Sequence, residues 1–258
     1  WANKAVDFTG SADATFTSCT VMSNSLANDS VNVAGNVDIT ADCMATAGQT
    51  SIRGDLTLTS CNAPLEDMPQ APDPYADLPE PPRPPACSPA PGGNPNAPKV
   101  WTPGRYCGGM NISGTATLAA GTYYVDGGQL RINGNSAVTG AGVTFFLTNG
   151  ATVSFNGSAN ITLSAPTSGT YAGVLMYGDR DHSDANNTFN GTANSSLTGA
   201  LYFPTQTVKH LGNFSGVNGC MRIVSRRIEI SGDTSFGTNC TGTGLDEIQV
   251  PGRIRLVE

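Results

Sequence analysis

The sequence predicts an all-β fold, a right-handed parallel β-helix of about nine coils, from three observations. A short glycine-containing phrase recurs along the chain, its copies lie about 20 residues apart, and long helix-forming runs are missing. Strand-rich units of this length, with glycine at their bends, are typical of a solenoid whose coils stack about 4.8 Å apart. The rule for crossover connections between parallel strands makes such a helix right-handed.

The recurring phrase is an apolar residue, a spacer, an apolar residue, a small or polar residue, and glycine. Alternation with a period of two, interrupted by glycine, indicates strands that bend at the glycine. A second glycine then opens another apolar strand, as in Gly121–Val125. The copies are Met110–Gly114, Leu130–Gly134, Val153–Gly157, Asn187–Gly191 and Ile228–Gly232, with a looser copy at Val208–Gly212.

The same phrase begins near the start of the chain, so we expect one domain over residues 1–258. Three early copies are Val6–Gly10, Val31–Gly35 and Ser51–Gly54. If all copies stack in register, their apolar residues form one inward-facing column. The predicted column contains Val6, Phe8, Val31, Val33, Ile52, Ile112, Ile132, Phe155, Phe189 and Ile230.

Residues 62–105 interrupt the repeat with a proline-rich insertion that holds most of the chain's 17 prolines. Proline cannot donate a backbone hydrogen bond to a β-ladder, so we expect extended, partly polyproline II backbone here. One interpretation is a strap that docks a partner protein. The other is an insertion that lies along the side of the rod and is pinned by a disulfide between Cys87 and Cys107.

Cysteine spacing gives an independent test of the register. Cys220 and Cys240 each lie eight residues after a repeat glycine, so stacked coils would place them within disulfide distance. The same reasoning allows Cys19 with Cys43 or Cys43 with Cys61. We take Cys19 with Cys43 as the pair, which leaves Cys61 as a free thiol or a bridge to another subunit.

Composition restricts the compartment and the partners. Stacked disulfides suit an oxidising, extracytoplasmic compartment. The net charge of −7 argues against nucleic acid and against anionic membrane surfaces as partners. No segment approaches the roughly 18 apolar residues of a membrane span, so we expect no membrane insertion of this chain. The sequence indicates no cofactor.

Several turn-and-strand phrases together resemble the C-terminal region of TadE/TadG-like, tight-adherence (Flp) pilus-associated proteins of bacteria. The resemblance implies a secreted or cell-surface, non-enzymatic role in adhesion or pilus biogenesis, with protein partners in a pilus or surface assembly. It supplies no catalytic residues. The phrases are Pro72–Pro79, Pro103–Gly109, Gly121–Val125, Gly140–Leu147, Ser164–Gly169, Tyr171–Arg180 and Gly199–Pro204.

The largest loop within a repeat gathers Asp179, Asp181 and Asp184 beside a histidine and an arginine. We expect a solvated turn with local ion pairs, and keep a cation site as an alternative. A carbohydrate-active enzyme is the second alternative, because lyases and hydrolases need carboxylates on a side wall. That enzyme would require one of these aspartates to meet Arg222 or Lys209 in a groove.

Two further alternatives concern surfaces. Outward threonine and serine ladders would favour binding to ice or to surface glycans. A flat binding face would need a strict Thr-x-Thr at one position on successive coils, and from sequence we align that pattern over no more than two coils. Uncapped coil edges would favour copies that join end to end as an extracellular filament. In the last segment, Ile248–Val257, the inward residues Ile254 and Leu256 are candidates for capping the last coil or for contacting a second copy.

Overall fold

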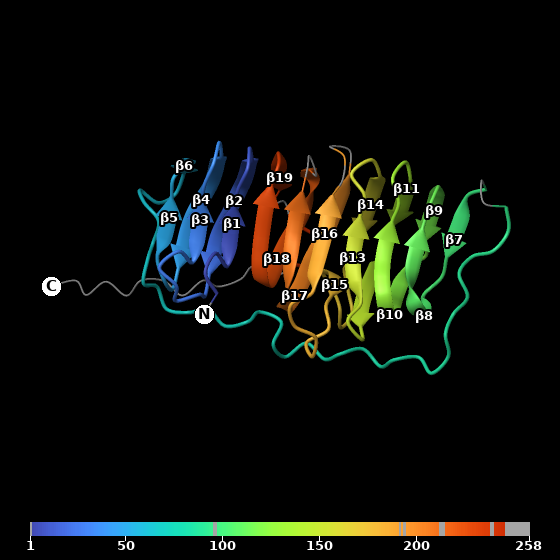
Figure 1. Ribbon diagram of the computed structural model, residues 1–258. Helices are drawn as coiled ribbons and strands as arrows, with labels where there is room; N and C mark the ends of the chain where they lie inside the picture. The colour runs from blue at the N-terminus through green and yellow to red at the C-terminus, as the bar shows by residue number, and fades with distance from the viewer. Residues whose placement is uncertain are drawn as a thin grey trace.

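The chain forms a right-handed parallel β-helix, shown here as a computed structural model (Figure 1). The structure describes residues 2–94, 97–190, 192, 195–211, 215–237 and 240–245. Within these ranges the chain is strand, turn and loop, with no α-helix. Nineteen strands join in one continuous sheet and pair in parallel within these ranges, as the glycine-marked repeat predicts.

Each coil contributes strands to three walls, and the longer strands bend across a corner from one wall to the next. The strands are β1 (Val6–Phe8), β2 (Asp13–Ser23), β3 (Val31–Val33), β4 (Asp38–Thr46), β5 (Thr50–Ile52), β6 (Asp55–Leu58), β7 (Lys99–Trp101), β8 (Gly104–Ile112), β9 (Thr115–Leu118), β10 (Gly121–Ile132), β11 (Ala137–Gly140), β12 (Val143–Thr148), β13 (Thr152–Phe155), β14 (Asn160–Ser164), β15 (Val174–Tyr177), β16 (Asn186–Asn190), β17 (Ser196–Leu211), β18 (Ser215–Ser231) and β19 (Thr234–Gly237).

The inward column has the predicted members. Ile112 pairs with Ile132, and Ile132 pairs with Phe155 on the following coil. The Phe155 and Phe189 rings then meet edge to face with centroids 5.3 Å apart. Except for Ile52, which is partly exposed, the predicted column residues are buried, so the alternation in the sequence identifies the core correctly.

The order of the coils differs from the order of the chain. Phe8 pairs with Ile230 on one side and with Val33 on the other, so the first coil stacks on the last described one. Figure 1 shows this as blue strands beside red ones. The stack therefore begins at β5 and β6, passes through β1 and β18, and ends at β7. We call residues 2–60 the N-terminal module and residues 99–237 the body.

The proline-rich segment connects the two parts and lies along the outside of the rod. It runs below the whole length of the stack in Figure 1, from the N-terminal module to β7. Strand pairing resumes at Lys99, where β7 pairs with β9, which is earlier than the predicted end of the insertion at residue 105. We call residues 62–98 the strap.

Three disulfides are formed, and one differs from the prediction. Cys220 joins Cys240 and Cys87 joins Cys107, the pairs expected from spacing and from the insertion. Cys43 joins Cys61, with Cα atoms 5.4 Å apart, so the predicted bridge from Cys43 to Cys19 is wrong. The reason is an irregularity in β2: the register with β4 shifts after Phe16, and Thr20 rather than Cys19 faces Cys43.

Two other expectations concern the end of the chain and membrane insertion. The predicted strand pair containing Ile254 and Leu256 lies outside the described residues. Within the described residues, no helix is long and apolar enough to cross a membrane.

One member of the inward column is titratable, and it gives the stack a predicted acid sensitivity. His210 lies between Phe189 and Ile230, is 1% exposed, and packs its ring on Phe236. Burial lowers the pKa of His210 to about 4. Protonation therefore favours the unfolded chain, and the stability present above pH 6.5 is lost as the pH falls through 4.

We expect this one group to cost about 3 kcal/mol of unfolding free energy between pH 7 and pH 4. His210→Ile, which matches the residue on the next coil, removes that part of the pH dependence. Denaturant unfolding of both proteins at the two pH values measures it, with His182→Gln in the exposed loop as the control. An unchanged pH dependence in His210→Ile would contradict the assignment.

Candidate functional surfaces

The first wall carries a column of aromatic rings that points away from the core. Successive coils place Tyr124, Phe146, Tyr177 and Tyr202 at one position of the register. Neighbouring ring centroids lie 5.8, 5.1 and 5.1 Å apart, with edge-to-face or strongly tilted geometry. All four residues are buried although they face outward, because the strap covers them. We call this surface the strap wall.

The strap supplies acceptors, and the strap wall supplies donors. Proline has a backbone carbonyl but no N–H, so a proline-rich segment contains more hydrogen-bond acceptors than donors. Its carbonyls therefore need donors from other parts of the protein. The Tyr124 hydroxyl donates to the Pro82 carbonyl at 2.6 Å, and the Tyr177 hydroxyl donates to Leu78 at 3.3 Å. Burial, which has the larger effect, and a hydrogen bond to Asp73 together raise the pKa of Tyr202 to about 12. Its hydroxyl therefore stays protonated and able to donate at neutral pH.

Arginines complete the attachment in the middle of the strap. Arg180 donates to the Tyr75 carbonyl at 2.6 Å and lies over the rings of Tyr177 and Tyr202, 5.1 and 5.4 Å from their centroids. Arg222 donates to the Tyr75 hydroxyl at 3.2 Å. The strap carries five carboxylates and one arginine in residues 62–98, so its charge complements these guanidinium groups.

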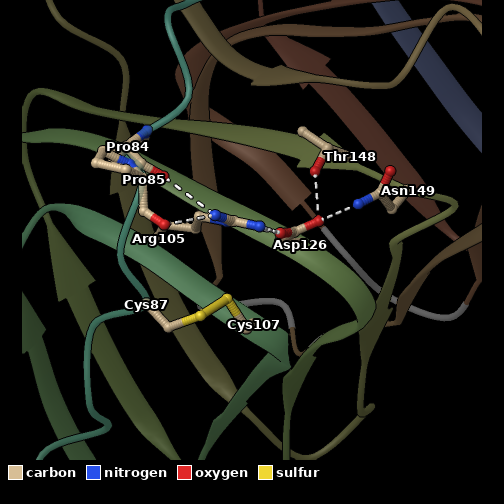
Figure 2. Close-up of a disulfide and its surroundings, with 8 residues drawn as sticks. All are labelled: Pro84, Pro85, Cys87, Arg105, Cys107, Asp126, Thr148 and Asn149. Atoms are coloured by element: carbon tan, nitrogen blue, oxygen red, sulfur yellow. Dashed lines mark hydrogen bonds and ion pairs between the residues drawn. A yellow bond between two sulfur atoms is a disulfide. The ribbon is translucent and has the colours of Figure 1, made fainter.

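The far end of the strap is fixed by a disulfide and by a shared arginine (Figure 2). Cys87 is bonded to Cys107, and Arg105 donates to the carbonyls of Pro84 and Pro85. On its other side, Arg105 donates to Asp126 at 2.6 Å. Burial alone would raise the pKa of Asp126, but hydrogen bonds from Arg105, Thr148 and Asn149 lower it overall. The carboxylate therefore stays ionised and holds the arginine in place.

The acidic loop between β15 and β16 is a turn held by hydrogen bonds and ion pairs, some within the loop and some to neighbouring segments. Asp179 is nearly buried and accepts from the backbone amides of Asn149 and Asp181, both at 2.9 Å. The His182 ring nitrogen Nδ1 lies 2.7 Å from the same carboxylate. Asp184 forms an exposed ion pair with Arg226. The local ion pairs agree with the expected solvated turn, and a buried aspartate organises it.

The structure does not bring the residues of the enzyme alternative together. Arg222 contacts the strap, while Lys209 pairs with Glu229 at 3.0 Å on a different wall. Of the loop aspartates, Asp179 contacts Asn149 and His182 while Asp184 pairs with Arg226, so these two carboxylates do not share one centre. In the described part of the chain, no three His, Cys, Asp or Glu side chains gather as metal ligands do.

The second wall carries charges that neutralise one another across coils. Glu229 pairs with Lys209 on one neighbouring coil and with Arg227 on its own strand. Arg227 reaches Asp7 on the next coil at 3.2 Å, and Asp7 accepts from Asn32 beyond it. We call this surface the charged wall. Its ion pairs join the body to the N-terminal module.

The third wall presents hydroxyl groups in a column. In the body, Thr117, Thr139, Thr162 and Ser196 occupy one register position on four successive coils. The column resumes in the N-terminal module at Thr15, Thr40 and Thr57. A strict Thr-x-Thr pattern does not continue along this wall, because Ala137 and Asn160 stand in the register of Thr115. Single hydroxyl residues nevertheless share one position over four coils, which the search for Thr-x-Thr did not reveal. We call this surface the hydroxyl wall.

From β9 to the start of β17, the described outward positions of the hydroxyl wall carry no charge, whereas the end strand β7 brings Lys99 and the exposed Val100 to this wall. Besides the hydroxyl column, its outward positions hold Thr115, Ala137, Asn160 and Thr198. In the N-terminal module the equivalent column is Asp13, Asp38 and Asp55. The wall is thus divided into a long neutral part and a short acidic part.

The chain was also compared with known proteins. No family model, curated protein or solved structure matches it. The three disulfides fit an extracellular or otherwise oxidising environment. The surfaces of the rod are therefore the features that bear on its function.

Sequence reasoning did not find the residues that hold the strap, although a signal for them was present. The strands around Tyr124, Phe146 and Tyr177 are apolar at consecutive positions rather than alternating, and β12 and β15 are buried throughout. A strand with both faces buried reads as a continuous apolar run. Such runs predict a cover on the outer face, and the strap is that cover.

We expect Arg180→Ala to loosen the middle of the strap. The side chain donates charge-assisted hydrogen bonds to the strap, and losing them lowers the free energy of local opening by about 2 kcal/mol. Hydrogen exchange at the Ala76 and Leu78 amides should then be about thirtyfold faster.

Arg131→Ala is the matched control, because Arg131 is exposed and donates within its own strand to Gln129. Equal exchange rates at Ala76 and Leu78 in Arg180→Ala and in the control would show that the strap does not depend on Arg180.

Proposed function

We propose that the chain is a non-enzymatic module of the bacterial cell surface, acting in adhesion or pilus assembly. The neutral part of the hydroxyl wall is its contact with uncharged surface glycans. The observation that carries this proposal is the four-coil column from Thr117 to Ser196 in a part of the wall, from β9 to β17, whose described outward positions carry no charge.

The neutral composition of this wall is not a general property of the strands. Threonine is common in strands because of its β-propensity, so its presence alone means little. The charged wall, built from the same coils, places Arg131, Lys209 and Glu229 at outward positions. The exclusion of charge is therefore specific to the part of the hydroxyl wall between β9 and β17.

The geometry suits an ordered, uncharged polyhydroxyl surface. Parallel strands repeat the hydroxyl groups about every 4.8 Å along the rod. Thr117 and Thr139 already contact each other through their Oγ1 atoms at 3.5 Å, so the side chains form a row rather than isolated groups. Small side chains keep the wall level, which allows many weak hydrogen bonds to form at once.

Secretion and attachment to a pilus belong to the same proposal. The three disulfides favour a location outside the cytoplasm, where such bonds persist, and together with the strap they stabilise the rod there. Partners in the assembly would be other surface proteins or copies of this chain.

The proposal predicts binding to an insoluble neutral polysaccharide such as microcrystalline cellulose. Thr139→Lys combined with Thr162→Lys should weaken binding at least about tenfold, because two ammonium groups then lose water against an uncharged surface. Depletion of the protein from solution by the polysaccharide measures the affinity.

Asn111→Lys on the charged wall is the matched control and should bind as the wild type does. The contact surface would be rejected if this control lost as much affinity as the double variant. Release of reducing ends during the same incubation would instead support the carbohydrate-active alternative.

A further inference from the structure

The junction between the N-terminal module and the body is an ordinary coil step made by distant parts of the chain. Val6 and Phe8 pair with Ile228 and Ile230 on the charged wall. On the hydroxyl wall, β2 pairs with β19, and the rings of Phe16 and Phe236 stack with centroids 4.8 Å apart. Nothing in these contacts requires both sides to belong to one chain.

None of the three disulfides in the described part of the chain crosses this junction. Cys43–Cys61 closes within the N-terminal module and at the start of the strap, Cys87–Cys107 fixes the strap to the body, and Cys220–Cys240 lies at the C-terminal side. The remaining cysteine, Cys19, is free. The module is therefore joined covalently to the body through the strap alone.

The strap is long enough to release the module. Between Cys61 and Cys87 the chain advances 26 residues (87−61), which reach about 80 Å in polyproline II geometry. The coils between β6 and β8, along which this stretch lies, span about 40 Å. The strap therefore has about twice the length that its own rod requires.

We propose that the N-terminal module can leave its own body and dock on the C-terminal coil of a second copy. A reciprocal exchange gives a dimer that retains every β-pair of the single chain, which makes exchange an inexpensive route to assembly. Exchange in one direction leaves a free module at one end of the assembly and a free C-terminal coil at the other, so further copies can add to it. The partner is a second copy of this chain.

Concentration decides between the two forms. A module tethered by a flexible linker has an effective concentration of about millimolar at its own body, and the strap's contacts raise this value. Exchange is therefore expected where copies are crowded, or where the strap is loosened. This proposal goes beyond glycan binding and does not depend on it, so either can fail alone.

A cysteine pair across the junction reports which chain supplies the module. Asp7 and Glu229 are direct partners on the charged wall, and Asp7→Cys with Glu229→Cys, in a Cys19→Ser background, would form a bridge there. The protein is unfolded with its native disulfides intact, refolded at about 10 µM or about 1 mM, oxidised, and separated on a non-reducing gel.

The expected result is a bridge within the chain at low concentration and a bridge between chains at high concentration. By mass action, the ratio of linked dimer to monomer should rise by up to about a hundredfold over this range. Adding Arg180→Ala, which loosens the strap, should increase the linked fraction further.

The matched control is Asn32→Cys with Ser51→Cys, because that pair lies within the module and must bridge within one chain in either form. A control that forms dimers equally would show random oxidation and overturn the assignment. A junction pair that bridges only within the chain, even at about 1 mM and with Arg180→Ala, would overturn the proposal.

Discussion

Vertical register is the constraint on which the rest of this structure depends. A strand in a parallel β-helix has its hydrogen-bonding groups satisfied only when another coil of the same geometry lies on each side. Between its two end coils, at Ile112 and at Ile52, the inward column meets this condition at the described steps, including the step from Ile230 to Phe8. The same condition explains the position of the N-terminal module, whose β1 covers the edge of β18 that would otherwise be open.

The sequence identified the members of this column but not their order. Each glycine-marked phrase presents the same apolar positions, so Phe8 fits on Ile230 as well as Ile52 would fit on Ile112. Choosing between those stacks depends on pairing across more than 200 residues, and no local pattern encodes such pairing. The disulfide in the N-terminal module shows the same limit on a smaller scale, because one irregularity in β2 decides that Cys43 meets Cys61.

The strap wall shows a different limit. Its strands carry consecutive apolar residues in the sequence, but the sequence does not show which segment covers them. Tyr123 and Tyr124 are neighbours in the chain, and one points into the core while the other points out, yet both are buried. A second apolar face on the same strands requires a second cover. The proline-rich insertion provides it, and its unpaired carbonyls require the donors that Tyr124, Tyr177 and Arg180 supply. The apolar runs and the proline-rich strap therefore depend on each other, because the strap covers the outer apolar face and that face supplies donors to the strap.

These relations assign different roles to the three walls. The strap occupies the first wall from Tyr124 to Tyr202, so that wall is closed to other partners while the strap is bound. The second wall satisfies its charges internally, since Lys209, Glu229 and Arg227 pair across coils and leave little unbalanced field to attract a ligand. Among the described residues, only the part of the hydroxyl wall from β9 to β17 combines regular spacing, exposure and the absence of charge. A contact made by this rod along its length is therefore expected there, whereas a contact made end to end depends on the module and the strap.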